Sequence, residues 1–205
     1  MKVELIHITP EAEKIIEEAG RTAWLTFDKK NEDSAEKFIR MLISRKHYSV
    51  LEHATATFRI SEVSRTMTHQ LVRHRLAAYT QQSQRVVKES DLKKYTIPPS
   101  IVNKCEEDGD LLPLQKFHTA MEHCFNAYDF LIDRGIKRED ARFVLPNACQ
   151  TQIVMTGNFR TWRHVIKMRG SKHAQWEIRA VAKEILRILW EECPSAFEDL
   201  KVYEV

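Results

Sequence analysis

The chain has 205 residues, of which 43% are hydrophobic and 30% are charged, a balance that is ordinary for a globular protein. Its formal net charge is only +3, which does not indicate a general nucleic-acid or membrane-surface role. The first residues lack the apolar core of a signal peptide, and no apolar run approaches the roughly 20 residues that cross a bilayer. We therefore expect a cytoplasmic protein that has neither a membrane nor a nucleic acid as its partner.

The first half of the chain carries signals for both strands and helices. Thr9 and Pro10 are typical of a helix entry, with Thr9 as the N-cap and Pro10 in the first helical position. Ser64 is a good N-cap for the helix that follows it. The predicted elements are a strand at 3–8, a helix to about Gly20, a helix at 34–45, a strand at 54–60 and a helix at 64–73.

The second half opens with a segment, residues 88–110, that contains a Pro-Pro pair, one glycine and many charges. This composition predicts a long loop or insertion. Further on, Asn158 and Ser171 are candidate N-caps of the last two helices. The predicted elements are a helix at about 114–131, a strand at 151–155, a helix at 159–168 and a helix at 173–191.

Helices dominate this order, with a few strands scattered among them. That pattern favours an α+β fold over regularly alternating βα units. We predict a single domain over residues 1–205, with a central mixed or antiparallel sheet flanked by long helices and an insertion at 88–110.

Metal and nucleotide fingerprints are missing from the sequence. The cysteines form no C-x-x-C pair, which predicts reduced thiols rather than a disulfide frame or a zinc site. No H-E-x-x-H, G-x-G-x-x-G or P-loop occurs. We therefore expect no metal, and neither standard nucleotide fingerprint is available. The four cysteines are Cys105, Cys124, Cys149 and Cys193.

A basic cluster, Arg73-His74-Arg75, follows the predicted helix at 64–73. Thr66, Gln70 and Arg73 are spaced i, i+4, i+7, so they form one polar stripe of a helix that ends in the cluster. Arginine binds phosphate oxygens bidentately and stays charged, so the cluster suits a pyrophosphate or two phosphates. A solvated basic helix end is an equally good explanation of the cluster alone.

A polar run, residues 79–85, comes next. In an extended backbone Gln81, Ser83 and Arg85 would share one face. Amide, hydroxyl and guanidinium groups together suit a phosphate and sugar hydroxyls. A polar edge strand is the alternative, but it leaves Arg85 unexplained beside the basic cluster.

Similar residue types recur downstream. Arg142 precedes a Pro-Asn pair, and Arg160 and His164 share a helix face at i, i+4. Arg169 lies at the turn between the last two long helices. Each residue alone is more often structural, but together they suggest a site for large anionic aromatic ligands.

With these residues the chain resembles the flavin-dependent thymidylate synthases. Arg73-His74-Arg75, seven residues and then Ser83 match the signature of that family. Segments 47–53 (HYSVLEH) and 141–146 (ARFVLP) are similar to two further family motifs. Asn158-Phe159-Arg160, Arg169 and the segment 173–177 follow in family order, so the resemblance covers about residues 47–86 and 139–198.

The resemblance implies an enzyme that makes dTMP from dUMP. Methylenetetrahydrofolate would supply the carbon, and NADPH would reduce a bound FAD that passes on the hydride. Family members are homotetramers whose active sites are built from several subunits. The implied FAD residues are Ser49, Arg73, His74, Arg75, Gln81, Asn158, Arg160 and His164. The implied dUMP residues are Gln70, Arg73, Gln81, Gln82, Ser83, Gln84, Arg85, Arg142 and Arg169.

Two of these positions carry more specific roles by the same resemblance. His47 would lie where folate or nicotinamide approaches the flavin, and Arg169 would activate the uracil ring. Methylation at the 5-position requires negative charge to build up on that ring, and a fixed guanidinium stabilises such charge in a dry site. A cysteine nucleophile is then not required.

Two positions depart from the family pattern. Gln81 stands where many members have an acidic residue, so it keeps the acceptor but loses the charge. Val86 follows Arg85 where the signature often has tyrosine, which removes an aromatic contact.

Two other functions compete with this one. A nucleotide- or RNA-binding module would use the same arginines, although aromatic residues make up only 9% of the chain. A helical interaction protein with basic helix ends leaves Gln81, Ser83 and Arg169 without a role.

Overall fold

A computed structural model describes residues 1–89 and 94–203. The chain divides into two compact units, and each is described by itself. Unit 1 comprises Met1–Ile60, Gln70–Thr80 and Ile153–Val205. Unit 2 comprises Ser61–His69 and Gln81–Gln152.

Four strands form one sheet in the order β1-β2-β4-β3. The hydrogen bonds at the strand ends run between the end of one strand and the start of its neighbour, as in Thr9 N–H to Thr55 O (2.9 Å) and Phe159 N–H to Ala54 O (2.9 Å). Neighbouring strands are therefore antiparallel. This confirms the predicted α+β class with a central antiparallel sheet. The strands are β1 (Lys2–Ile8), β2 (Thr55–Ser64), β3 (Ala78–Gln81) and β4 (Gln150–Asn158).

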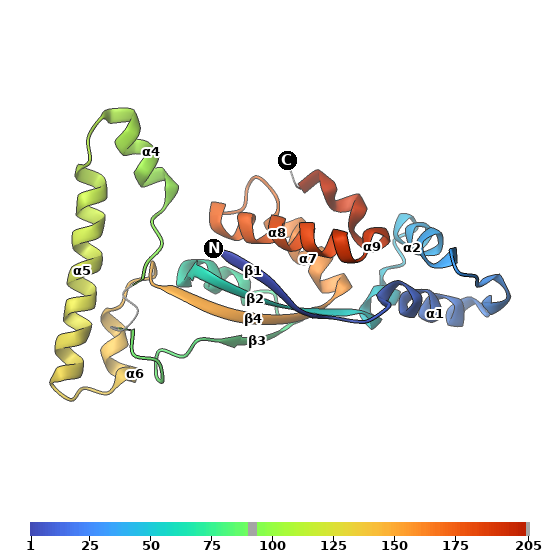
Figure 1. The fold of residues 1–205 in the computed structure, drawn as a ribbon, viewed down its shortest axis with the longest axis horizontal. Coiled ribbons are helices and arrows are strands. Elements are labelled where there is room, and N and C mark those ends of the chain that lie inside the picture. The colour runs from blue at the N-terminus through green and yellow to red at the C-terminus, as the bar shows by residue number, and fades with distance from the viewer. Residues whose placement is uncertain (90–93, 204–205) are drawn as a thin grey trace. The chain divides into compact units, whose positions relative to one another are not determined.

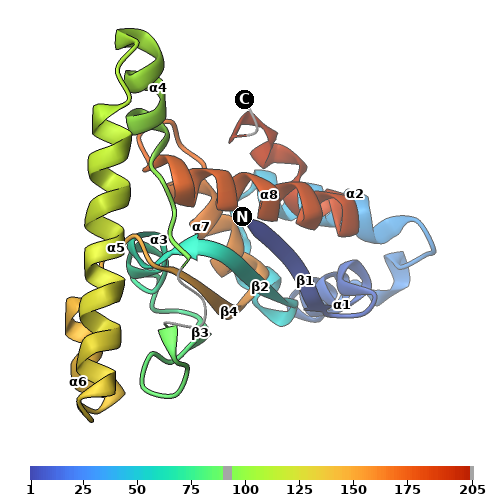
Figure 2. The same ribbon diagram turned by 60° about the vertical axis from the view of Figure 1, so that its left-hand side comes forward.

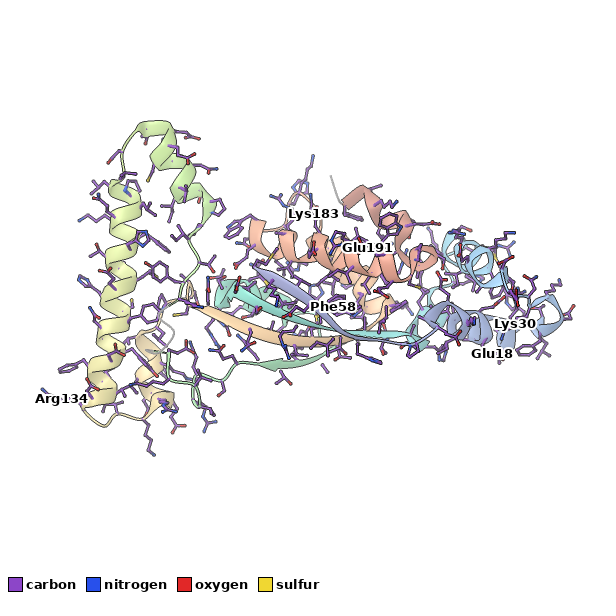
Figure 3. The ribbon with its side chains drawn as sticks, in the orientation of Figure 1. Glu18, Lys30, Phe58, Arg134, Lys183 and Glu191 are labelled. Atoms are coloured by element: carbon purple, nitrogen blue, oxygen red, sulfur yellow. The ribbon has the colours of Figure 1, made fainter. Side chains whose placement is uncertain are left out.

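In unit 1, helices cover one face of the sheet (Figure 1). Successive side chains of a strand point to opposite faces, and the buried residues Ala56, Phe58 and Ile60 of β2 follow that alternation. Phe58 lies between β2 and the helices (Figure 3), where its ring meets the fully buried Trp162 edge-on at 5.1 Å. The Trp162 indole N–H donates to Ala56 O (3.0 Å), which satisfies the polar atom of this buried ring.

The helices of unit 1 come from both ends of the chain. Helices α7 and α8 pack against each other on the sheet (Figure 2). The helices of unit 1 are α1 (Ala12–Trp24), α2 (Ser34–Ser44), α7 (Phe159–Arg169), α8 (Trp176–Glu192) and α9 (Pro194–Phe197). Short 3-10 helices occur at η1 (Phe27–Lys29), η2 (Tyr48–His53) and η5 (Glu198–Tyr203).

The predicted start and end of the first helix are wrong. Helix α1 begins at Ala12, and Thr9 instead extends the strand pairing, with its hydroxyl 3.2 Å from Thr55 Oγ1. The helix also continues past Gly20 to Trp24. Gly20 allows a close approach rather than a helix end, because an added Cβ would lie 2.6 Å from the Phe38 ring.

Two of the three other predicted caps are confirmed. The Ser64 hydroxyl accepts from Met67 N–H (3.0 Å), and Asn158 Oδ1 accepts from Thr161 N–H (2.9 Å). Ser171 does not cap the last long helix, which begins at Trp176 rather than at 173. Gln175 caps it, because its Oε1 accepts from the Glu177 (3.0 Å) and Ile178 (3.2 Å) N–H groups.

Unit 2 contains the longest helix, α5, beside the shorter α4 (Figure 2). Part of the predicted loop at 88–110 is helical, because α4 occupies Pro99–Asp108 with a proline at its first position. Residues 90–93 of that segment lie outside the described residues. The elements of unit 2 are α4 (Pro99–Asp108), α5 (Leu112–Asp133), α6 (Arg138–Ala141) and η4 (Arg142–Val144). Helix α3 (Arg65–Leu71) contributes residues to both units.

No helix within residues 1–89 and 94–203 is both long enough and apolar enough to span a membrane. The four cysteines all carry free thiols. No group of three or more His, Cys, Asp or Glu side chains in the described part of the chain is arranged to hold a metal ion.

Candidate functional site

A cavity of about 810 Å³ lies within unit 1, a size in the usual range for small-molecule sites. Six of the residues predicted to bind FAD line it, although they come from segments some 80 residues apart in the sequence. The lining residues are Glu52, Arg73, His74, Arg75, Leu76, Asn158, Arg160, Thr161 and His164.

The basic cluster reaches the cavity from a turn rather than from a helix. Helix α3 ends at Leu71, so the predicted helical stripe does not extend to Arg73. The Tyr79 hydroxyl holds the turn by bridging the carbonyl oxygens of Leu71 (3.0 Å) and His74 (2.7 Å). Burial raises the pKa of Tyr79 to about 12, so the hydroxyl remains a neutral donor.

Helix α7 supplies the opposite part of the lining. Asn158 caps this helix, and Arg160 and His164 both line the cavity one turn apart, as their spacing predicts. Arg160 Nη1–H donates to Glu52 Oε1 (2.5 Å), and both side chains are about half exposed. An exposed ion pair of this kind contributes little to stability, roughly 0–1 kcal/mol, so Arg160 is available to a ligand.

His74 is a neutral acceptor rather than a third cation. Arg169 Nε–H donates to His74 Nε2 (2.9 Å), which places the imidazole proton on Nδ1. Burial, the Arg169 charge and His164 lower the pKa of His74 to about 4. The cluster therefore presents two positive charges at neutral pH, from Arg73 and Arg75.

Arg169 also donates through Nη2 to the backbone oxygen of Gln70 (3.4 Å). Gln70, His74 and Arg169 all belong to unit 1 and were all predicted as ligand-binding residues. The structure brings these three together, and Arg169 itself is not among the residues that line the 810 Å³ cavity.

Two predicted residues, His47 and Ser49, line a second cavity of unit 1, of about 360 Å³. Arg160 lines both cavities. The His47 ring meets the Trp24 ring edge-on at 6.0 Å. Trp24 is a lining residue that the sequence did not single out.

The predicted extended run at 79–85 is only partly correct. Strand β3 ends at Gln81, and the chain then turns, with Val87 N–H donating to Ser83 O (2.9 Å). Gln81, Ser83 and Arg85 therefore do not alternate along one extended face. In unit 2, the Gln81 amide donates to the Thr68 hydroxyl (3.0 Å) instead.

Gln82 and Gln84 are held by a glutamate that the sequence did not single out. Gln82 Nε2 donates to Glu89 Oε1 (3.3 Å), and Gln84 also hydrogen-bonds this carboxylate. Glu89 is buried, which raises its pKa, while the two amides oppose that rise.

Arg85 and Arg142, both predicted to bind dUMP, contact Glu139 in unit 2. Arg85 Nε–H donates to Glu139 Oε2 (3.1 Å), and Arg142 Nε–H donates to the Glu139 backbone oxygen (3.1 Å). Glu139 lies in the first turn of α6. Its contact with Arg85, 54 residues away in the sequence, depends on tertiary packing that no local pattern indicates.

Three residues of the 810 Å³ cavity were missed as ligand contacts. Glu52 lay in the segment 47–53, whose similarity to a family motif was the available signal. Thr161 and Leu76 gave no signal, and they are joined by a hydrogen bond from Thr161 Oγ1 to Leu76 O (3.1 Å).

Comparison with known proteins places these features in a family. The family model of the thymidylate synthase complementing protein matches residues 4–195. The flavin-dependent thymidylate synthase of Geobacter sulfurreducens is 40% identical, over 97% of this chain and 86% of that protein. The enzyme of the same name from Clostridium tetani is 39% identical, with the same coverage of both chains.

Solved structures agree with the sequence comparison. Thymidylate synthase X from Helicobacter pylori, crystallised with FAD and dUMP, is 25% identical and has a TM-score of 0.78. The match covers 98% of both chains.

Proposed function

Because this chain belongs to the family of flavin-dependent thymidylate synthases, we propose that it converts dUMP into dTMP and holds FAD as its cofactor. The observation that supports this most directly is the cavity of unit 1, which gathers Arg73, Arg75 and Arg160 with the polar groups of Asn158 and His164.

The donor set of that cavity fits FAD. The guanidinium groups of Arg73 and Arg75 suit the anionic diphosphate, because they stay charged and bind oxygens in pairs. Neutral donors and acceptors beside them suit the sugar and ring atoms. The proposed FAD residues are Ser49, Arg73, His74, Arg75, Gln81, Asn158, Arg160 and His164.

FAD, when bound and reduced by NADPH, would supply the hydride that completes the methyl group. Methylenetetrahydrofolate as the carbon donor and NADPH as the reductant are part of the same proposal. His47 lines the cavity of about 360 Å³ that adjoins the flavin residues through Arg160, which supports a role where folate or nicotinamide enters.

Arg169 is the proposed activating residue. Its guanidinium is held at Nε and Nη2, so its remaining N–H groups keep a defined direction. A fixed positive charge beside a uracil carbonyl or N3 stabilises the negative charge that methylation at the 5-position requires.

Two of the four cysteines, Cys149 and Cys193, are poorly suited to attack the ring. Burial raises the pKa of Cys149 to about 12 and raises that of Cys193 further. Both thiols are therefore protonated at neutral pH, while a nucleophile must be a thiolate. This supports a reaction in which Arg169, not a cysteine, activates the substrate.

The family resemblance also implies a set of residues that bind dUMP. Arg85 and Arg142 would bind the phosphate, which would compete with the Glu139 carboxylate for Arg85. The full set is Gln70, Arg73, Gln81, Gln82, Ser83, Gln84, Arg85, Arg142 and Arg169.

A homotetramer with active sites shared between subunits is also part of the proposal, as is a cytoplasmic location. The four free thiols support a reducing compartment.

The function is tested by following NADPH oxidation with and without dUMP and methylenetetrahydrofolate, coupled to detection of dTMP. Purified protein should be yellow with flavin absorbance, and dTMP should form only when all substrates are present. A colourless protein that takes up no added FAD would contradict the proposal. So would NADPH oxidation that never yields dTMP.

A further inference from the structure

The side chains of His74 and Arg169 are joined although they lie 95 residues apart in the sequence. Arg169 Nε–H donates to His74 Nε2 (2.9 Å), within unit 1. The family signature marks His74 as one of three neighbouring ligand-binding residues, and it gives no reason for this contact. The bond makes His74 a partner of the proposed activating residue.

His74 is itself firmly placed. Its side chain is buried, with only 8% of the residue exposed. Its backbone oxygen accepts from the Tyr79 hydroxyl (2.7 Å), and its ring meets the His164 ring at 5.6 Å. An acceptor fixed in this way can set the direction of a guanidinium that bonds to it.

The guanidinium has five N–H donors in one plane. Two of them are engaged, at Nε with His74 and at Nη2 with the Gln70 backbone oxygen (3.4 Å). Two anchor points fix both the position and the plane of the group. Within residues 1–89 and 94–203 the Nη1 donors have no partner, so they remain for an acceptor on a ligand.

We propose that His74, as the neutral Nδ1–H tautomer, is a positioning residue that aims the Arg169 guanidinium at the uracil ring. The inference rests on the proposed function, because it assigns His74 a task in substrate activation that is separate from holding FAD. His74 acts through Arg169 and need not touch the substrate.

The charges around His74 favour the neutral form. Arg169 and His164 face it from α7, and Arg73 and Arg75 flank it in the chain. Glu52 of η2, which lines the same cavity, is paired with Arg160. Protonation of His74 would remove the acceptor and put two cations in contact. The lowered pKa of about 4 agrees with this arrangement.

The test uses two substitutions that differ in one property. His74→Gln keeps an acceptor near the position of Nε2, whereas His74→Leu keeps the bulk and removes the acceptor. Each is combined with Arg169→Ala, and dUMP binding to the FAD-loaded protein is measured by calorimetry. His123→Gln is the control, because this histidine is exposed on α5 and lines neither cavity of unit 1.

His74→Leu should weaken dUMP binding roughly tenfold when Arg169 is present and less than about twofold when it is alanine, as expected for a coupled pair. In His74→Leu the kcat should fall by a larger factor than the KM for FAD rises. His74→Gln should retain most of the dUMP affinity and kcat that His74→Leu loses. Equal losses in both Arg169 backgrounds would overturn the proposal. So would glutamine and leucine variants that are equally impaired.

A measurement on the wild-type sequence covers the case in which His74→Leu does not fold. In protein labelled with ¹⁵N-histidine, the His74 signals, identified by their loss in His74→Gln, should be those of an Nδ1–H tautomer. They should move in Arg169→Ala. A proton on Nε2 would overturn the proposal by itself.

Failure of the proposed function and failure of the positioning role would give different results. Wild-type protein that holds FAD but forms no dTMP would contradict the function, while the tautomer measurement would still decide whether His74 accepts from Arg169. Wild-type protein that forms dTMP, with no coupling between the two residues, would overturn only the positioning role.

Discussion

Arg169 is the charged group on which the proposed chemistry depends most. Replacing it with alanine should lower dTMP formation by at least about 100-fold, the usual loss when a group that stabilises developing charge is removed. FAD should stay bound, because Arg169 is not among the residues that line the 810 Å³ cavity. The measurement is dTMP yield together with flavin absorbance of the purified variant.

Arg187→Ala is the matched control for that experiment. Arg187 also belongs to unit 1, but it is exposed and pairs with Glu184 and Glu191 along α8. Its removal should leave dTMP yield unchanged. An Arg169→Ala protein with normal yield would show that the activating role is wrongly assigned.

Arg142 is expected to act on the phosphate of dUMP rather than on the ring. Arg142→Ala should weaken dUMP binding by roughly 1.5–3 kcal/mol, the range for hydrogen bonds to charged groups. Deoxyuridine, which lacks the phosphate, is the control ligand and should bind both proteins equally. Calorimetry with the two ligands separates these outcomes, and an equal loss for both would argue against a phosphate contact.

His74 should also make stability depend on pH. Its pKa is about 4 in the folded protein and near 6.5 in the unfolded chain, so between these values only the unfolded chain takes up the proton. Stability therefore falls as the pH falls, by roughly 2 kcal/mol between pH 7 and pH 5. Urea unfolding of the wild type and His74→Gln at both pH values measures it. The contribution should be absent from the glutamine variant, and identical pH slopes would contradict the shift.

Helix α7 carries Arg160, His164 and Arg169, so its first turn affects the whole site. Asn158→Ala removes the cap that Oδ1 forms with Thr161 N–H and should cost about 1 kcal/mol of stability. FAD affinity should fall as well, because Asn158 lines the cavity. Chemical unfolding and FAD titration measure the two effects.

Ser171→Ala is the control for Asn158→Ala. Ser171 looks like an N-cap in the sequence, but Gln175 caps α8. The serine variant should therefore lose less than about 0.5 kcal/mol, as is usual away from such features. A loss as large as that of Asn158→Ala would mean that the cap of α8 is wrongly placed.

The same helices show why some elements were predictable. Ser64 and Asn158 cap the residues immediately after them, so the sequence nearby holds the whole signal. A glycine such as Gly20 is typical of a helix end, yet α1 continues to Trp24. Here the glycine is needed because the Phe38 ring packs closely against it. The turn at Ser83 ends the extended run through local hydrogen bonds from the Val86 and Val87 N–H groups to Ser83 O, which the alternation of residue types does not predict.

For the whole molecule, the resemblance predicts an assembly of four chains. Light scattering of the FAD-loaded protein should give four times the chain mass of 24.1 kDa. Activity should fall on dilution if the sites need more than one subunit, because dissociation would then separate their residues. A fully active monomer would contradict both the assembly and the shared sites.

One domain over residues 1–205 also stays a prediction. Strands β2 and β4 each contribute residues to both compact units. A single cooperative unfolding transition is therefore expected.

By itself the sequence determined the α+β class, most of the helices and the family. It also determined that Arg160 and His164 share a helix face and that Arg73 and Arg75 flank a histidine. Each of these features depends on residue types at short, regular spacings. In a helix or strand, such spacings place side chains on one face or at a cap position.

Only the tertiary structure decided what the charged and polar groups do. It joined Arg169 to His74, paired Arg85 with Glu139, and turned Gln81 toward Thr68. It also made His74 neutral, because that charge depends on burial and on a cation 95 residues away in the chain. Hydrogen-bond partners and desolvation depend on which distant segments pack together, and no local pattern of residues specifies them.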